Sequence, residues 1–229
     1  MIQAVLFEFD GVIADTRDAR RAALLDTLEE DGLTLEESEY LECCAAMPVR
    51  SSVRAAFARR SVAGDETLIE LTAVRAERRF SSIVGAGVSL AAGARELIQS
   101  LSGQARLGIV SRAARQEIES ALSLAALEHV FEFVIAGDDP YRAKPAPDAY
   151  LASIDRLSRR RAIAARDIVA LEDGPAGIRA AKGAGLRCAV VGSLPVHLAV
   201  DADALIPSLA GQTLASIDAL TAGASIPGR

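Results

Sequence analysis

With 229 residues, of which 51% are hydrophobic, 24% charged and 4% aromatic, the chain is long enough to bury a core and too apolar to be disordered. Its 25 basic and 31 acidic residues leave a net charge of -6, which excludes nucleic acid and anionic membrane surfaces as expected partners. Three cysteines, Cys43, Cys44 and Cys188, provide neither a disulfide framework nor a spaced zinc site. With no export or membrane segment in view, they indicate a cytoplasmic protein.

The first predicted element is a strand over the apolar run Ile2 to Phe9, which Asp10 and Gly11 close. Similar runs follow and alternate with segments of helical spacing, so the sequence predicts an α/β fold with a doubly wound parallel sheet. The further predicted strands are Arg106 to Val110, Phe133 to Ala136, Ile168 to Leu171 and Arg187 to Val191. The predicted helices are Gly93 to Ser100, Ala113 to Leu124 and Ala146 to Leu157.

Residues from Thr16 to about Ser82 interrupt this alternation, because they have helical spacing and no convincing strand. We therefore expect an all-helical cap, residues 15–82, inserted after the first strand of a core made of residues 1–14 and 83–229. This cap should lie over the carboxyl edge of the sheet. The final segment, Asp203 to Ala222, is predicted as a short strand, a loop and a closing helix.

Ligands of open α/β sheets bind beyond the carboxyl ends of the strands, so the residues that end each strand are the first candidates. Glu8 and Asp10 end the first strand, and residues two apart in a strand point to the same side. Such a pair suits a nucleophile and a general acid or base. The alternative is a pair of solvated acids at the end of a strand.

Ser111 ends the second predicted strand, where its hydroxyl and the first N–H groups of the next helix suit an anion. The alternative is an ordinary helix cap. Lys144 lies in a proline-stiffened loop and is one of only two lysines in a chain that otherwise uses arginine. Its ammonium suits both a carboxylate and a phosphoryl oxygen, and the alternative is a plain surface charge.

Glu172 and Asp173 end the fourth predicted strand and bring two more acids to the same edge. Carboxylates gathered in this way repel one another unless a cation compensates them. Mg²⁺ or a lysine would supply that compensation, and oxygen ligands suit Mg²⁺.

At these residues the chain resembles the haloacid dehalogenase superfamily, in the phosphatase and phosphomutase branch that carries a helical cap after the first strand of a Rossmann-like core. Four segments carry the resemblance, in order and over essentially the whole chain: VLFEFDGVIADT, IVSR, AKPAPDAY and VALEDGPAGIRAAKGAGL. Together they imply a hydrolase that acts on a small phosphorylated metabolite through an acyl-phosphate intermediate.

The resemblance also implies the roles of individual residues. Residue 8 attacks phosphorus, and Asp10 protonates the leaving oxygen and then activates water. Ser111 and Lys144, with Arg112 beside them, bind the phosphoryl group. Mg²⁺ is held by residue 8, the Asp10 carbonyl, Asp173 and Glu172.

One position departs from the family pattern, because the family nucleophile is Asp and this chain has Glu8. The extra methylene moves the carboxylate by about 1.5 Å, and a misplacement on the order of 1 Å can cost about a hundredfold in rate. The chain is therefore either an impaired or adapted phosphatase, or a non-catalytic protein that binds Mg²⁺ and a phosphorylated metabolite.

Other reactions of the family are less favoured by the sequence. Asp10 provides the proton that an oxygen leaving group needs and a halide does not, which disfavours dehalogenation. The cap contains no lysine, which disfavours phosphonate hydrolysis through a Schiff base, and Arg17, Asp18 and Arg20 stand where mutases carry a histidine. A sugar phosphomutase is therefore the less favoured alternative. Arg50 in the cap is a candidate for binding a substrate anion, or one of several surface arginines.

Overall fold

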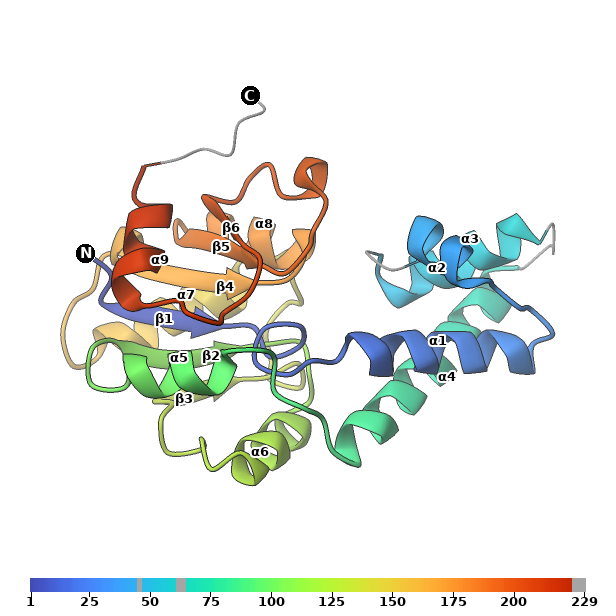
Figure 1. Ribbon diagram of the computed structural model, residues 1–229, viewed down its shortest axis with the longest axis horizontal. Coiled ribbons are helices and arrows are strands. Elements are labelled where there is room, and N and C mark those ends of the chain that lie inside the picture. The colour runs from blue at the N-terminus through green and yellow to red at the C-terminus, as the bar shows by residue number, and fades with distance from the viewer. Residues whose placement is uncertain (45–46, 61–64, 224–229) are drawn as a thin grey trace. The chain divides into compact units, whose positions relative to one another are not determined.

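The computed structural model describes residues 1–44, 47–60 and 65–223 (Figure 1). The chain divides into two compact units, one formed by Met1–Asp15 with the chain from Ser89 onward, and the other by Thr16–Val88. The second unit extends beyond residue 82 because its last helix, α4 (Glu66–Gly85), keeps burying residues on one side as far as Val84.

The first unit is built on a parallel sheet whose described strands run in the order β3-β2-β1-β4-β5-β6. Their bounds are β1 (Ala4–Phe7), β2 (Arg106–Val110), β3 (Phe133–Ile135), β4 (Ile168–Glu172), β5 (Arg187–Val191) and β6 (Ala204–Ile206). The chain order reverses direction between β1 and β4, so the predicted doubly wound α/β fold is confirmed. In the register of the sheet, Phe7 pairs with Ile109 of β2 and with Leu171 of β4. The carboxyl ends of these three central strands are therefore level.

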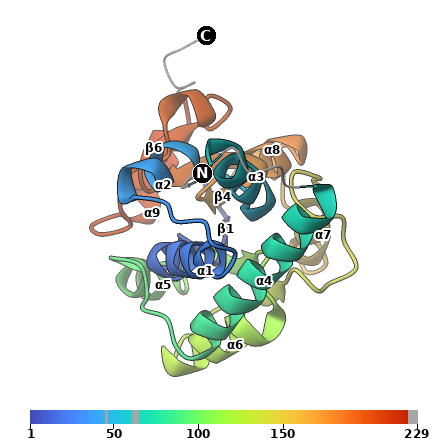
Figure 2. The ribbon, with the colours of Figure 1, turned by 90° about the vertical axis from the view of Figure 1, so that its right-hand side faces the viewer.

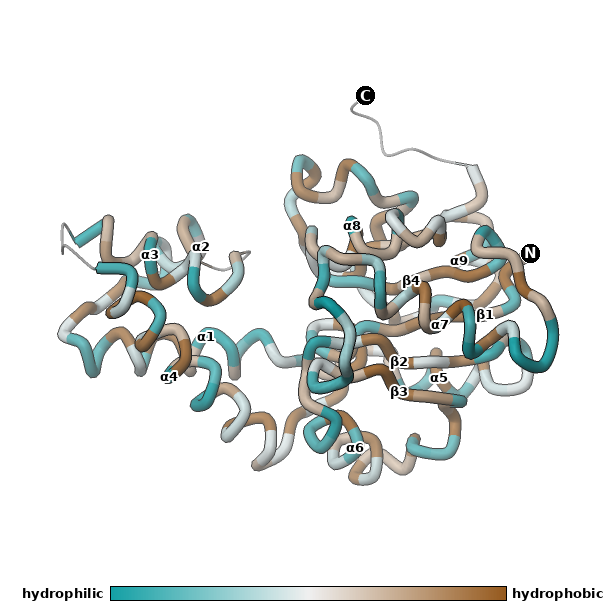
Figure 3. The backbone as a smooth tube through the Cα atoms, turned by 180° about the vertical axis from the view of Figure 1, so that it is seen from behind, coloured by the Kyte–Doolittle hydropathy of each residue, from teal (hydrophilic) through white to brown (hydrophobic). Residues whose placement is uncertain are grey.

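Helices cover both faces of this sheet (Figures 1 and 3). Their bounds are α5 (Ala94–Leu101), α6 (Arg115–Leu124), α7 (Asp148–Ser158), α8 (Pro175–Gly183) and α9 (Leu214–Thr221). One buried cluster packs Tyr150 of α7 and Ile178 of α8 against Leu6, Ala170 and Cys188 of the sheet. Because β1 and β4 are buried on both faces, their sequences are continuous apolar runs instead of alternating ones.

The first strand is shorter than the sequence predicts. β1 ends at Phe7, although the Glu8 backbone N–H still donates to Leu171 O at 2.9 Å. The chain then turns, with the N–H groups of Ile13 and Ala14 donating to Phe9 O. Gly11 lies in this turn at φ +74°, a left-handed conformation that favours glycine. Strand alternation therefore places Glu8 but not Asp10.

The second unit consists, in its described part, of helices (Figure 2). These are α1 (Arg17–Glu30), α2 (Glu37–Cys43), α3 (Val49–Arg59) and α4. A hydrophobic cluster holds them together, with Leu28 from α1, Tyr40 from α2, Phe57 from α3 and Ile69 from α4. The expected helical insertion thus has its own core.

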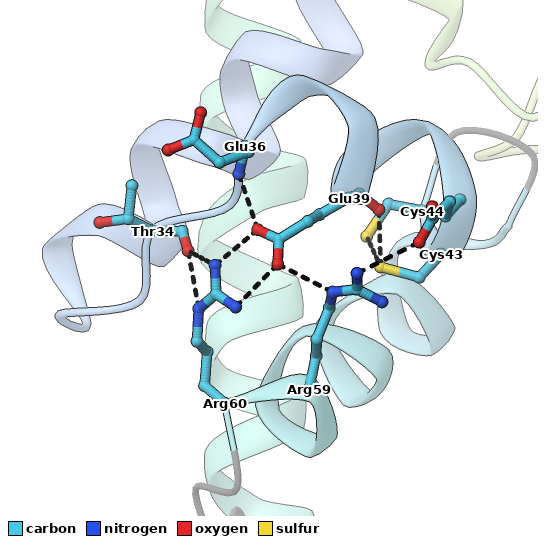
Figure 4. Close-up of polar contacts among 8 residues, drawn as sticks. Thr34, Glu36, Glu39, Cys43, Cys44, Arg59 and Arg60 are labelled. Carbon is cyan, nitrogen blue, oxygen red and sulfur yellow. Dashed lines mark hydrogen bonds and ion pairs between the residues drawn. The ribbon is translucent and has the colours of Figure 1, made fainter.

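A charged network ties α2 to the end of α3 (Figure 4). Glu39 accepts hydrogen bonds from Arg59 Nε at 2.9 Å, from Arg60 and from the Glu36 backbone N–H at 2.9 Å. These contacts, led by the Arg60 hydrogen bond, lower the pKa of Glu39 to about 2.

Among the helices of the described residues, none has the length and the apolar character that a membrane span requires.

Candidate active site

Glu8 lies at the carboxyl edge of the sheet with both carboxylate oxygens in contact with hydrogen-bond donors. Oε1 accepts from Ser111 Oγ and from the Phe9 backbone N–H at 2.9 Å, and Oε2 accepts from Lys144 Nζ. The residue is only 4% exposed. The level ends of β1 and β2 bring Glu8 and Ser111 together, as the strand-end argument predicts.

Lys144 is the centre of this cluster. It lies in the loop between β3 and α7, and its Nζ donates to Glu8 Oε2, to Glu172 Oε1 at 2.7 Å and to Val110 O at 2.8 Å. An ammonium has three N–H groups, so all of them have acceptors. Lys144 therefore binds Glu8, which follows β1, and Glu172, which ends β4, and it does not serve as a surface charge.

Ser111 does not cap a helix. The helix predicted from Ala113 begins at Arg115, because a turn intervenes in which the Ala113 N–H donates to Ser111 Oγ at 3.1 Å. With its oxygen accepting that bond, the hydroxyl proton is free to point at Glu8. This arrangement favours the anion-binding interpretation of Ser111 over the helix cap.

Tyr150 belongs to this cluster, although its place in the sequence did not indicate it. This residue is fully buried in α7, and its hydroxyl donates to Glu172 Oε1. In the sequence it is one of the apolar positions of a helix. The sequence offered only the general indication that a tyrosine hydroxyl buried in a helix needs a polar partner.

Glu172 is placed by the same contacts. Its Oε1 accepts from Lys144 and Tyr150, and a Cβ on Gly177 would lie 1.8 Å from its Oε2. Only glycine at position 177 leaves room for this carboxylate. Its contact with Lys144 fits the alternative that a lysine compensates this acid, and its role as a metal ligand stays a prediction.

The two buried glutamates differ in their affinity for a proton. Burial raises the pKa of Glu8, but the charge of Lys144 and the hydrogen bonds from Lys144 and Ser111 outweigh it and hold this pKa below its ordinary value. Burial raises the pKa of Glu172, and the nearby Glu8 charge adds to the rise despite Lys144. The pKa of Lys144 is raised, because both carboxylates outweigh the effect of burial. Glu8 is therefore the more acidic of the two buried carboxyl groups.

Asp173 lies next to the turn after β1, because a Cβ on Gly11 would be 2.7 Å from its Oδ2. This places a carboxylate beside the backbone that carries the Asp10 carbonyl. Hard oxygen donors of this kind fit Mg²⁺. Among residues 1–44, 47–60 and 65–223, however, no group of three His, Cys, Asp or Glu side chains is arranged to hold a metal.

The remaining candidates are not joined to this cluster by the contacts described above. Arg50 pairs with Glu66 at 2.9 Å and Glu70 at 3.1 Å within the helical unit, and it is 53% exposed. Arg112 follows Ser111 but is exposed. Their proposed roles in substrate binding stay predictions.

The fold and this cluster define an α/β protein with buried acidic residues, a serine and a lysine at the carboxyl edge of its sheet. A family model for haloacid dehalogenase-like hydrolases matches residues 5–191, which is most of the chain. The chain therefore belongs to the haloacid dehalogenase-like hydrolase family. It is an enzyme of the phosphatase branch of that family.

Three relatives illustrate the similarity. Protein CbbY of Cereibacter sphaeroides is 31% identical over 200 residues, covering 83% of this chain and 84% of that protein. Validoxylamine A 7'-phosphate phosphatase of Streptomyces hygroscopicus subsp. limoneus is 31% identical over 210 residues and covers 90% of each. A crystal structure of a CbbY mutant from Rhodobacter sphaeroides in complex with xylulose-1,5-bisphosphate is 27% identical. Its TM-score is 0.70, and it covers 94% of this chain and 99% of that one.

Proposed function

We propose that the chain is a Mg²⁺-dependent phosphatase that hydrolyses a phosphomonoester of a small phosphorylated metabolite through a phosphoryl-Glu8 intermediate. The observation that carries this proposal is the buried cluster at the carboxyl edge of the sheet. In it, a carboxylate, a hydroxyl and an ammonium meet, and Asp173 lies against the turn that follows the same strand.

In the first step, a Glu8 oxygen forms a bond to phosphorus while the bond from phosphorus to the leaving oxygen breaks. Asp10 gives its proton to that oxygen. Ser111 and Lys144 donate hydrogen bonds to the phosphoryl oxygens, whose charge they stabilise. In the second step Asp10 takes a proton from water, the water oxygen bonds to phosphorus, and the bond to Glu8 breaks.

Glu8, Asp173 and the Asp10 carbonyl would hold Mg²⁺, which when bound neutralises the charge that the carboxylate nucleophile and the phosphoryl group bring together. Glu172 supports this site indirectly, because it fixes Lys144.

Sugar phosphates are the first substrates to test, because one relative has been solved with xylulose-1,5-bisphosphate and another acts on validoxylamine A 7'-phosphate. Phosphate release should depend on Mg²⁺ and stop when EDTA is added. No release from a broad panel, with Mg²⁺ and phosphate still bound, would favour the non-catalytic binder. The engagement of both Glu8 oxygens is the observation on the side of that alternative.

The role of Asp10 has its own test. Asp10→Asn should slow hydrolysis of sugar phosphates by at least about a hundredfold and that of p-nitrophenyl phosphate much less, since p-nitrophenolate leaves without a proton. Steady-state kcat/KM for both substrates provides the comparison. Equal losses on the two substrates would remove Asp10 from this role.

A further inference from the structure

The Glu8 carboxylate occupies a position where donors of three kinds converge. A side-chain hydroxyl (Ser111), a backbone N–H (Phe9) and an ammonium (Lys144) all donate to its two oxygens. We call these three donors the cradle. Donors that converge in a buried place are what a small oxyanion requires, because each oxygen that leaves water must find a replacement hydrogen bond.

The cradle is held in place without Glu8. Lys144 Nζ is fixed by Val110 O at 2.8 Å and by Glu172 Oε1 at 2.7 Å, and the Tyr150 hydroxyl fixes Glu172 in turn. Ser111 Oγ is fixed by the Ala113 N–H at 3.1 Å. These contacts would remain if the Glu8 side chain were removed, so the donors would keep their positions.

We propose that the cradle is an oxyanion site whose resident ligand is the chain's own Glu8 carboxylate, so that an external oxyanion must displace it. This inference depends on the proposed function in one respect, because it takes the phosphoryl group of the substrate as the external oxyanion. Glu8 is tethered and therefore competes at a high effective concentration. The apparent affinity for an external ligand falls by the fraction of molecules in which the cradle is open.

Side-chain length explains why this residue fills the cradle. An aspartate at position 8 would end about 1.5 Å short of the place that the glutamate carboxylate reaches. Its oxygens would then no longer reach all the donors at hydrogen-bond distance. The extra methylene is therefore what lets this carboxylate occupy the cradle.

The test measures binding of inorganic phosphate in EDTA by calorimetry, so that it needs neither turnover nor metal. Glu8→Ala should bind phosphate at least about tenfold more tightly than the natural chain, because the cradle is then open. Glu128→Ala removes an exposed carboxylate from the same unit and should change nothing, which controls for overall charge. Adding Ser111→Ala to Glu8→Ala should abolish the gain.

A second measurement protects the test against a variant that is merely less stable. Formate should raise the Tm of Glu8→Gly in a concentration-dependent way and leave that of the natural chain unchanged, because an external carboxylate refills the cradle. The proposal fails if folded Glu8→Ala gains no affinity for phosphate, or if formate stabilises both proteins equally.

The outcomes separate this inference from the proposed function. Hydrolysis by the natural chain without any gain in phosphate affinity on Glu8→Ala would leave the function standing and overturn the self-occupied cradle. A gain in affinity without hydrolysis by any Mg²⁺-loaded form of the chain would do the reverse.

Discussion

Lys144 is the residue on which the buried charges of this protein depend. Its ammonium lies between Glu8 and Glu172, and all three side chains are buried. Buried ions are tolerated only when they are paired and hydrogen-bonded, because the loss of water costs several kcal/mol for each ion. Removal of the shared cation would therefore leave two carboxylates without their counterion.

We expect Lys144→Met to lower the free energy of unfolding by about 3–5 kcal/mol, the usual cost of breaking a buried ion pair from one side. The only other lysine, Lys182, is a matched control, because it pairs with Asp203 at 2.7 Å in a partly exposed position. Lys182→Met should cost less than about 1 kcal/mol. Urea unfolding at pH 7 measures both, and similar losses for the two variants would contradict the central position of Lys144.

Asp173 provides the second test at the residue scale. Its carboxylate lies beside the turn at Gly11, so Asp173→Ala should weaken Mg²⁺ binding by at least about tenfold, as oxygen donors of the protein are what hold this hard cation. Calorimetric titration with MgCl₂ measures the change. Asp201→Ala, which removes an exposed acid, serves as the control. Unchanged Mg²⁺ affinity in Asp173→Ala would mean that the metal is held elsewhere.

At the scale of elements, the helical unit relies on charge as well as on its apolar core. Glu39 of α2 receives both Arg59 and Arg60 from the end of α3, so its ionised form links the two helices (Figure 4). Its pKa of about 2 lies below the ordinary 4.5. A carboxyl group whose pKa is lowered by folding stabilises the folded state above its ordinary pKa, and that contribution disappears as the pH falls through the folded value.

We therefore expect Glu39→Gln to reduce the stability of the protein at pH 7. The difference from the natural chain should shrink as the pH falls from about 4.5 to about 2. Helical circular dichroism followed through urea unfolding at several pH values gives the measurement. Glu29→Gln, which neutralises an exposed acid on α1, is the control for the loss of one carboxylate from the same unit. A difference between Glu39→Gln and the natural chain that persists unchanged at pH 2 would show that the carboxylate charge is not what matters.

The sequence located the strands of the sheet well because they are apolar runs bounded by polar residues. β2 and β5 begin and end where predicted. The predicted bounds of strands and helices were wrong where a local turn intervenes. β1 stops before Asp10 because the chain folds back at Phe9, and α6 starts late because Ser111 organises a turn of its own. Turns of this kind depend on individual backbone hydrogen bonds, which hydrophobic periodicity does not report.

The same distinction holds for the site. The sequence predicted that Glu8, Ser111 and Glu172 meet at one edge, because parallel strands in register end level. It could not show which acceptors Lys144 chooses, since its loop has no periodic pattern. Nor could it show that Gly177 makes room for Glu172, which depends on the backbone of a helix that follows in the chain.

At the scale of the whole molecule, the helical unit is inserted through two segments that pair with each other. Ala14 and Leu90 form an antiparallel bridge, and the Ala91 N–H donates to Ile13 O at 2.8 Å. The first of these segments continues directly from the turn at Gly11, against which Asp173 packs. The base of the insertion and the candidate metal site therefore share one short stretch of backbone.

Glu8 is the side chain at which this chain departs from the family pattern described above. We propose that the cradle and Asp173 form the phosphatase site and that Glu8 fills the place that a phosphoryl group would take. The length of residue 8 should then limit the rate. Shortening it keeps the charge and the attacking carboxylate and opens the cradle.

The most direct measurement is the turnover of a sugar phosphate and of p-nitrophenyl phosphate by the natural chain and by Glu8→Asp, with Mg²⁺ present. We expect Glu8→Asp to raise kcat/KM at least about tenfold, which corresponds to about 1.4 kcal/mol of transition-state stabilisation. A phosphoryl group on the new aspartate should be trapped by rapid quench. If activity instead falls in Glu8→Asp while the natural chain turns over, Glu8 is an adapted nucleophile, and the view that its length blocks the cradle is wrong.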